Sequence, residues 1–144
     1  MSVFAQSWLF WALLSAVFAA MTAILAKLGT QNVDPDVATL VRTVVILALV
    51  FGIVAVRGKF SGVGQVPGSS LGWLVASGLA TGASWLCYFR ALKLGDAARV
   101  APIDKLSVVF VAVFAVVLLG ERLGALGWAG VGFIALGAGL LAIS

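Results

Sequence analysis

Three ionisable side chains interrupt long apolar stretches of this sequence: Arg42, Asp104 and Lys105. Charged groups are costly inside a bilayer, and in membrane helices they commonly mark the path of a solute or an ion. At 1.5 Å per residue, each lies about 7–9 Å beyond the start of its predicted helix. Because both helices enter from the same side, we expect the three residues to lie at one depth.

We interpret this layer, which has an excess of positive charge, as a polar vestibule that attracts an anionic or zwitterionic solute, with Lys105 in contact with that solute. Other interpretations stay open. Arg42 and Asp104 can form an ion pair, and Lys27 and Arg90, which border the layer, can extend along apolar surface to the lipid headgroups.

A face that is both polar and aromatic is predicted on the third apolar stretch. Thr81, Ser84, Trp85 and Tyr88 follow steps of three to four residues, which place them on one side of a helix. Such a face can line a solute cavity, and it can equally form hydrogen bonds to a neighbouring helix. These four residues and the three ionisable ones form the predicted substrate-binding set.

Residue types that most enzymatic and metal sites require are missing from the sequence. It has no histidine and a single cysteine, Cys87, which lies inside an apolar stretch. The sequence shows no pairing of a nucleophile with a base, no phosphate-binding loop and no metal-ligand spacing. It therefore predicts a protein that is not an enzyme and that uses no metal or other cofactor.

The chain that must position these residues is strongly apolar. Hydrophobic residues make up 63% of it and charged residues 10%, against roughly 25% charged in an ordinary soluble domain. So few charges cannot coat a soluble core, and the bilayer must therefore solvate most of the surface. The basic residues occur singly between apolar runs, which argues against binding to nucleic acid.

Five apolar stretches reach the length of about 20 residues that a helix needs to cross the hydrocarbon core. We predict a single domain, residues 1–144, that is all-α and integral to the membrane, a bundle of five transmembrane helices. The predicted helices are 8–28, 37–56, 71–92, 99–119 and 125–143.

The breaks between these stretches carry residues typical of helix ends. Asp34 can cap a helix that begins at Pro35, and Ser69 or Ser70 can cap the third helix. Pro102 falls in the first turn of the predicted fourth helix, where its missing N–H costs little. One helix is therefore expected to run through this proline.

Lys and Arg near the helix ends are balanced between the two sides of the membrane. Five spans place the termini on opposite sides, with three basic residues near the side of the N-terminus and four near the other. They are Arg57, Lys59 and Arg122 on the first side, and Lys27, Arg90, Lys93 and Arg99 on the second. Because loop Lys and Arg set orientation, this balance predicts insertion both ways, as in a pair of inverted copies.

Short motifs mark the ends of the last helices: Ala-Leu-Lys-Leu-Gly at 91–95, Pro102 at the head of the fourth helix, Leu-Gly-Glu at 119–121 and Trp-Ala-Gly at 128–130. Together with the basic Arg42 near the start of the second helix, they resemble the EamA-like domain of the drug/metabolite transporter superfamily. The resemblance covers nearly the whole chain, including the spacing of its five spans.

This resemblance implies a multi-pass transporter of a small organic solute in the cytoplasmic (inner) membrane. Most members carry two such domains in inverted orientation, whereas this sequence has one. We therefore expect half of an inverted-repeat transporter, which works as an antiparallel homodimer by alternating access. The alternatives are a half-size flippase subunit for a lipid-linked carrier, with a different small partner, and a non-transporting scaffold or accessory subunit.

Overall fold

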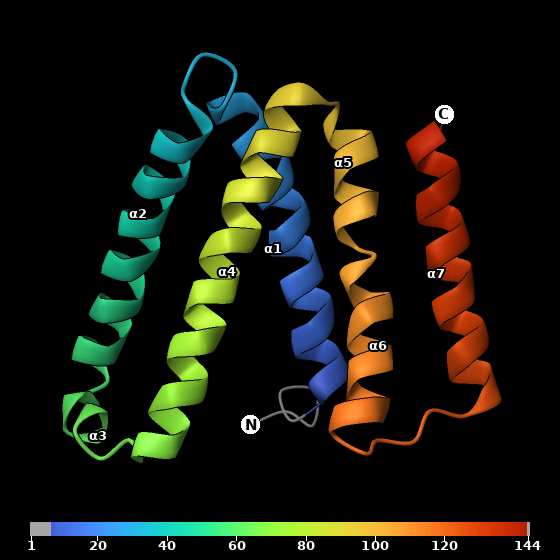
Figure 1. The fold of residues 1–144 in the computed structure, drawn as a ribbon. Coiled ribbons are helices and arrows are strands. Elements are labelled where there is room, and N and C mark those ends of the chain that lie inside the picture. Colours follow the sequence, from blue (N-terminus) through green and yellow to red (C-terminus); the bar gives the residue numbers. More distant parts are fainter. Residues whose placement is uncertain (1–6, 144) are drawn as a thin grey trace. The chain divides into compact units, whose positions relative to one another are not determined.

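The computed structural model describes residues 7–143, so residues 1–6 and 144 of the predicted domain lie outside the described chain. The regular secondary structure of residues 7–143 is entirely helical (Figure 1). The chain divides into two compact units. The central unit is Leu28–Lys93, and the terminal unit combines residues 7–27 with residues 94–143. An all-helical fold is confirmed.

The central unit is built on α2 (Pro35–Val56), which starts and stops where local chemistry requires. The Asp34 carboxylate accepts hydrogen bonds from the backbone N–H groups of Asp36, at 2.9 Å, and of Val37, at 3.3 Å. This cap, followed by Pro35 as the first helical residue, confirms the prediction. At the other end Gly58 adopts a φ of 61°, a conformation that favours glycine, and the chain turns away.

The same unit continues through the single turn α3 (Phe60–Val63) into α4 (Gly68–Leu94), which runs antiparallel to α2 (Figure 1). Phe60 packs on Phe51 of α2, with ring centroids 5.0 Å apart. The predicted caps Ser69 and Ser70 are wrong, because α4 begins at Gly68 and both serines lie inside its first turn. The Leu71 N–H bonds instead to the carbonyl of Pro67, at 2.9 Å.

The terminal unit contains α1 (Trp8–Gly29) as far as Lys27, followed in sequence by α5 (Ala97–Asp104), α6 (Ser107–Leu118) and α7 (Ala125–Ile143). α7 returns alongside both α5 and α6 (Figure 1). Gly120, with a φ of 69°, reverses the chain after α6.

The predicted single helix over 99–119 corresponds to one span, Ala97–Leu118, in which residues 105–106 separate α5 from α6. Helix α5 starts at Ala97, so Pro102 is its sixth residue rather than part of its first turn. Proline has no N–H for the carbonyl four residues before it, and its ring crowds that carbonyl. The helix tightens after it: the Leu106 N–H bonds to Ile103 at 3.0 Å, three residues back, and α6 restarts at Ser107.

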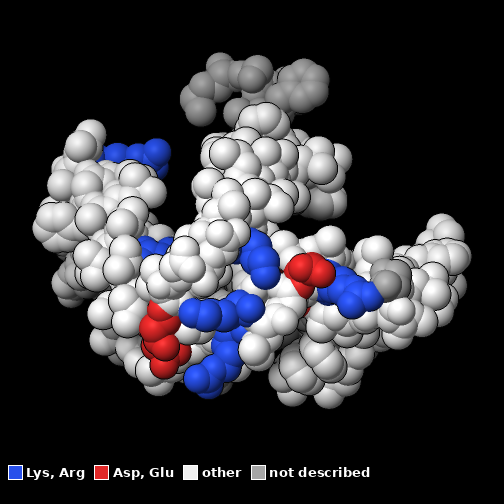
Figure 2. Space-filling model, turned by 90° about the horizontal axis from the view of Figure 1, so that it is seen from above, with Lys and Arg blue, Asp and Glu red and all other residues white. Residues whose placement is uncertain are grey.

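Four segments of residues 7–143 are long and apolar enough to cross a membrane: α1, α2, the continuous stretch Ala97–Leu118, and α7. Figure 2, a view from above onto the helix ends, shows Lys, Arg, Asp and Glu side chains among mostly uncharged ones. Helix α4 has 27 residues but is not among the four, because glycine, serine and threonine reduce its hydropathy. A multi-pass membrane protein is therefore supported, and the predicted count of five spans is not confirmed.

Candidate functional site

Arg42 lies on aromatic rings in the central unit. It is the eighth residue of α2, about 10 Å along the helix from Pro35. Its guanidinium carbon lies 4.2 Å from the centroid of the Trp85 ring and 5.3 Å from that of Phe89, both on α4. The ring of Tyr88 meets Phe89 edge-on at 6.5 Å. The structure thus joins Arg42, Trp85 and Tyr88 of the predicted set through one cluster of rings.

Phe89 is a member of this cluster that the sequence reasoning missed. It is 3% exposed and supports both the guanidinium and the Tyr88 ring. A signal for it was present, because Phe89 follows Trp85 by four residues and therefore shares its helix face. Its side chain carries no polar group, so it was not counted with the polar and aromatic face of this helix.

The positive charge of Arg42 has no carboxylate partner within the central unit. The two acids of this unit are Asp34 and Asp36, at the start of α2, and the Asp34 carboxylate already accepts two backbone N–H groups. A guanidinium over an aromatic ring gains cation–π attraction, while its N–H groups point outward in the plane of the group. Arg42 is therefore held in place by contacts that do not neutralise it.

Thr81 and Ser84 complete the predicted face of α4. The side chains of Thr81 and Ser84 are both exposed. The Thr81 hydroxyl donates a hydrogen bond to the carbonyl of Ser77 in its own helix, at 2.8 Å. Since that bond uses the one proton of the hydroxyl, Thr81 offers a solute acceptor capacity only. Arg42 lies over Trp85, one turn further along α4.

Asp104 and Lys105 lie at the break between α5 and α6 in the terminal unit. Their side chains form an ion pair, with 3.0 Å between the Lys105 Nζ and an Asp104 carboxylate oxygen. The side chains are 56% exposed for Lys105 and 33% for Asp104. This pair compensates both charges locally, in contrast to Arg42. An ion pair between Arg42 and Asp104, and a common layer of Arg42, Asp104 and Lys105, would each involve both units. Both stay predictions.

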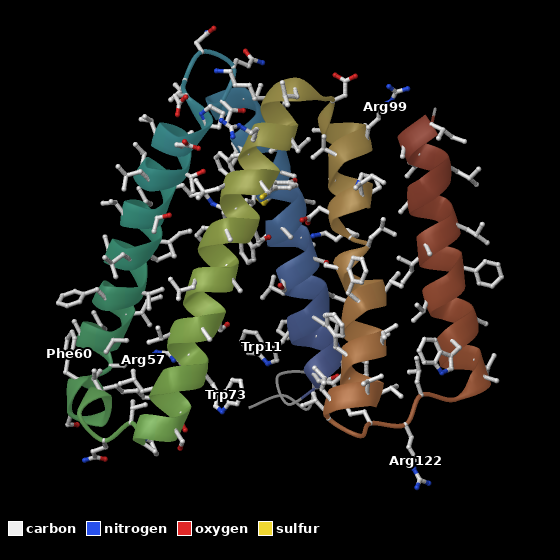
Figure 3. All side chains as sticks on the ribbon, in the orientation of Figure 1. Trp11, Arg57, Phe60, Trp73, Arg99 and Arg122 are labelled. Atoms are coloured by element: carbon white, nitrogen blue, oxygen red, sulfur yellow. The ribbon has the colours of Figure 1, made fainter. Side chains whose placement is uncertain are left out.

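Two lysines at helix ends hold loops in place. The Lys27 Nζ donates to the carbonyl of Gly95, at 2.8 Å within the terminal unit, and the Lys93 Nζ donates to the carbonyl of Val33, at 2.7 Å within the central unit. Sequence reasoning assigned Lys27 to the lipid headgroups and missed this bond. Figure 3 shows other cations at helix ends, with Arg57 near Phe60 in the central unit, and Arg99 and Arg122 at opposite ends of the terminal unit.

Residues 6–143 match the EamA-like transporter family. The chain belongs to this family. A curated relative from Sinorhizobium sp, named "Uncharacterized transporter in cobO 3'region", is 61% identical over 138 residues, which are 96% of this chain and 98% of the relative. No solved structure matches the sequence.

Membership of the EamA-like family confirms the resemblance read from the short motifs. Together with the apolar helices, it supports a multi-pass membrane transporter and points away from an enzyme. The coverage of the relative also bears on domain organisation. Since the match takes in 98% of that protein, the relative has about the length of this chain.

Proposed function

We propose that this EamA-like protein transports a small organic solute, anionic or zwitterionic, across the cytoplasmic membrane by alternating access. The observation that carries the proposal is the break between α5 and α6. It lies at residues 105–106 of the 22-residue span Ala97–Leu118, close to the middle. Discontinuous membrane helices form the sites of many transporters, because a broken helix can bend and exposes polar groups where a continuous one cannot.

We further propose that α4 crosses the membrane as a fifth span. At 1.5 Å per residue its 27 residues extend about 40 Å, more than the hydrocarbon core requires. Its two charged residues, Arg90 and Lys93, are both near its C-terminal end. Trp73, near its start, is 80% exposed, as suits an anchor at the membrane interface.

Five spans make a thin bundle, and the family usually provides two such domains. We therefore propose an antiparallel homodimer of oppositely inserted copies. The balanced loop charges support it, three basic residues on one side against four on the other. The length of the Sinorhizobium relative supports it as well, since that protein, named an uncharacterized transporter, is about as long as this chain.

Two variants with fixed orientation test the homodimer and transport together. One receives extra lysines in the loop between α2 and α4, and the other receives them in the turn between α4 and α5. Each inserts one way only and, alone, is expected to be inactive in uptake of a labelled solute panel. Co-expression of the two is expected to restore uptake. Wild-type uptake by either variant alone would overturn the antiparallel homodimer.

A reporter experiment tests the fifth span separately. In either variant with fixed orientation, a reporter inserted after residue 66 and one inserted after residue 96 are expected to lie on opposite sides of the membrane. Reporters on the same side would show that α4 does not cross. In a Cys87→Ser chain that keeps both orientations, single cysteines along residues 108–117 should cross-link between copies at mirrored depths.

A further inference from the structure

Arg42 is the most informative cation of the chain, because its surroundings hold it without neutralising it. It is half-buried on α2, three residues after Thr39 and next to Thr43, and its guanidinium lies over the rings of Trp85 and Phe89. A charge at this depth is costly unless it has a partner or reaches water. Within the central unit, the Arg42 side chain has ring contacts and no carboxylate.

The geometry also limits what can approach the group. A guanidinium presents five N–H donors in one plane, and a ring that stacks on its face leaves the edge open. The edge is the part that forms paired hydrogen bonds to the two oxygens of a carboxylate or a phosphate. A lysine, with its flexible stem and point charge, cannot reproduce this arrangement.

Lys105 serves as the internal comparison. Its ammonium group forms an ion pair with the adjacent Asp104 at 3.0 Å and is more than half exposed. An incoming anion would compete there with a carboxylate that is already in place, whereas at Arg42 no carboxylate of the central unit competes. The observed charges therefore favour Arg42 over Lys105 as the anion-binding group.

We propose that Arg42, held over Trp85 and Phe89, binds the carboxylate or phosphate oxygens of the transported solute. Arg42 is the binding residue, and Trp85 is a positioning residue that keeps the edge of the guanidinium available. This inference rests on the proposed transport function and adds to it the anionic group of the solute, a carboxylate or a phosphate, and the residue that recognises it.

Binding is measured on the full chain in phosphatidylcholine nanodiscs, where transport plays no part. The probes are glycerol 3-phosphate and succinate, titrated at constant ionic strength with chloride as the control anion, and tryptophan fluorescence is the readout. Wild-type protein is expected to bind at least one oxoanion in preference to chloride. Arg42→Gln is expected to weaken that binding by about tenfold to hundredfold, because it removes charge-assisted hydrogen bonds.

Three further variants separate recognition from folding. Arg42→Lys keeps the charge and is expected to lose most of the affinity, which keeps the test decisive if Arg42→Gln does not fold. Arg57→Gln removes the same residue type from the other end of α2 and is expected to bind as wild type does. Trp85→Leu is expected to weaken binding by about threefold to tenfold, because it removes the cation–π contact. When Arg42→Lys is combined with Trp85→Leu, the second substitution should lower the affinity little further.

The source of the anion is settled in a second arm, in which phosphatidylglycerol replaces part of the phosphatidylcholine. If the anionic lipid competes with glycerol 3-phosphate in wild type and not in Arg42→Gln, the site takes lipid phosphate, and binding of a free solute is overturned. Absence of competition supports a free solute. The inference is also overturned if wild type shows no preference over chloride, or if Lys105→Gln abolishes binding while Arg42→Gln retains it.

These results can be told apart from a failure of the transport proposal. Uptake that requires both oppositely oriented variants, with no oxoanion bound at Arg42, would leave the transporter standing and the recognition site wrong. Binding at Arg42 without uptake of any solute would leave the recognition site standing and the transport proposal wrong.

Discussion

Arg42 in the central unit and Lys105 in the terminal unit are both cations within long apolar segments, yet they are held in opposite ways. Arg42 belongs to a continuous helix and contacts aromatic rings from the neighbouring α4. Lys105 lies at a helix break and contacts the adjacent carboxylate of Asp104. Rings position a cation and leave its charge available, whereas a carboxylate neutralises it. The comparison separates a charge suited to binding from a charge suited to structure.

The largest expected effect is on transport by Arg42→Gln. If Arg42 binds the solute, its loss should lower the initial rate of uptake at low solute concentration by about tenfold to hundredfold, with protein abundance near wild type. Lys105→Gln should lower the same rate by less than about tenfold, because its charge is already compensated. Initial rates in proteoliposomes provide the measurement, and equal losses in the two variants would remove the distinction.

The second prediction concerns the pair at the helix break. Lys105→Met leaves the Asp104 carboxylate without its partner in an apolar segment, which should lower the free energy of unfolding by roughly 1–3 kcal/mol. The double variant Asp104→Asn with Lys105→Met should recover most of that loss, because no charge is then left alone. Denaturant titrations in bicelles give both values. A double variant no more stable than Lys105→Met would show that the pair is not a stabilising unit.

The third prediction concerns the break itself. Pro102→Ala supplies an N–H for the carbonyl of Ala98 and removes the ring, which should stiffen the span and raise the free energy of unfolding by about 1 kcal/mol. Uptake should fall several-fold if transport requires the span to bend. Spin labels at Arg99 and Val117 would report the straightening of the span. A straightened span with undiminished uptake would argue against a role in transport for the break.

The smallest expected effects are at the two loop-binding lysines. Lys27→Met should lower the free energy of unfolding by about 1 kcal/mol, because its bond to Gly95 is partly buried. Lys93→Met should cost less than about 1 kcal/mol, since its bond to Val33 is exposed to solvent competition. Thermal unfolding in one detergent compares the pair, and a larger cost at Lys93 would contradict the order expected from burial.

The membrane class, the family and most helix ends can be read from the amino-acid sequence without a structure. These depend on composition and on interactions within a few residues. Apolar length predicts a span, and the Asp34-Pro35 cap acts within one turn, so both are legible along the chain. The start of α5 was missed by two residues, so Pro102, the sixth residue of α5, was placed in the first turn.

The partner of each charged side chain, in contrast, depends on how the helices pack. Arg42 meets rings more than forty residues away in sequence, and Lys27 and Lys93 reach carbonyls 68 and 60 residues away. Lys105 instead pairs with its immediate neighbour, Asp104. Spacing along one helix fixes the face on which a side chain lies. The partner depends on which helix packs opposite that face and which conformations a long, flexible side chain can adopt there, and neither is a local property of the sequence.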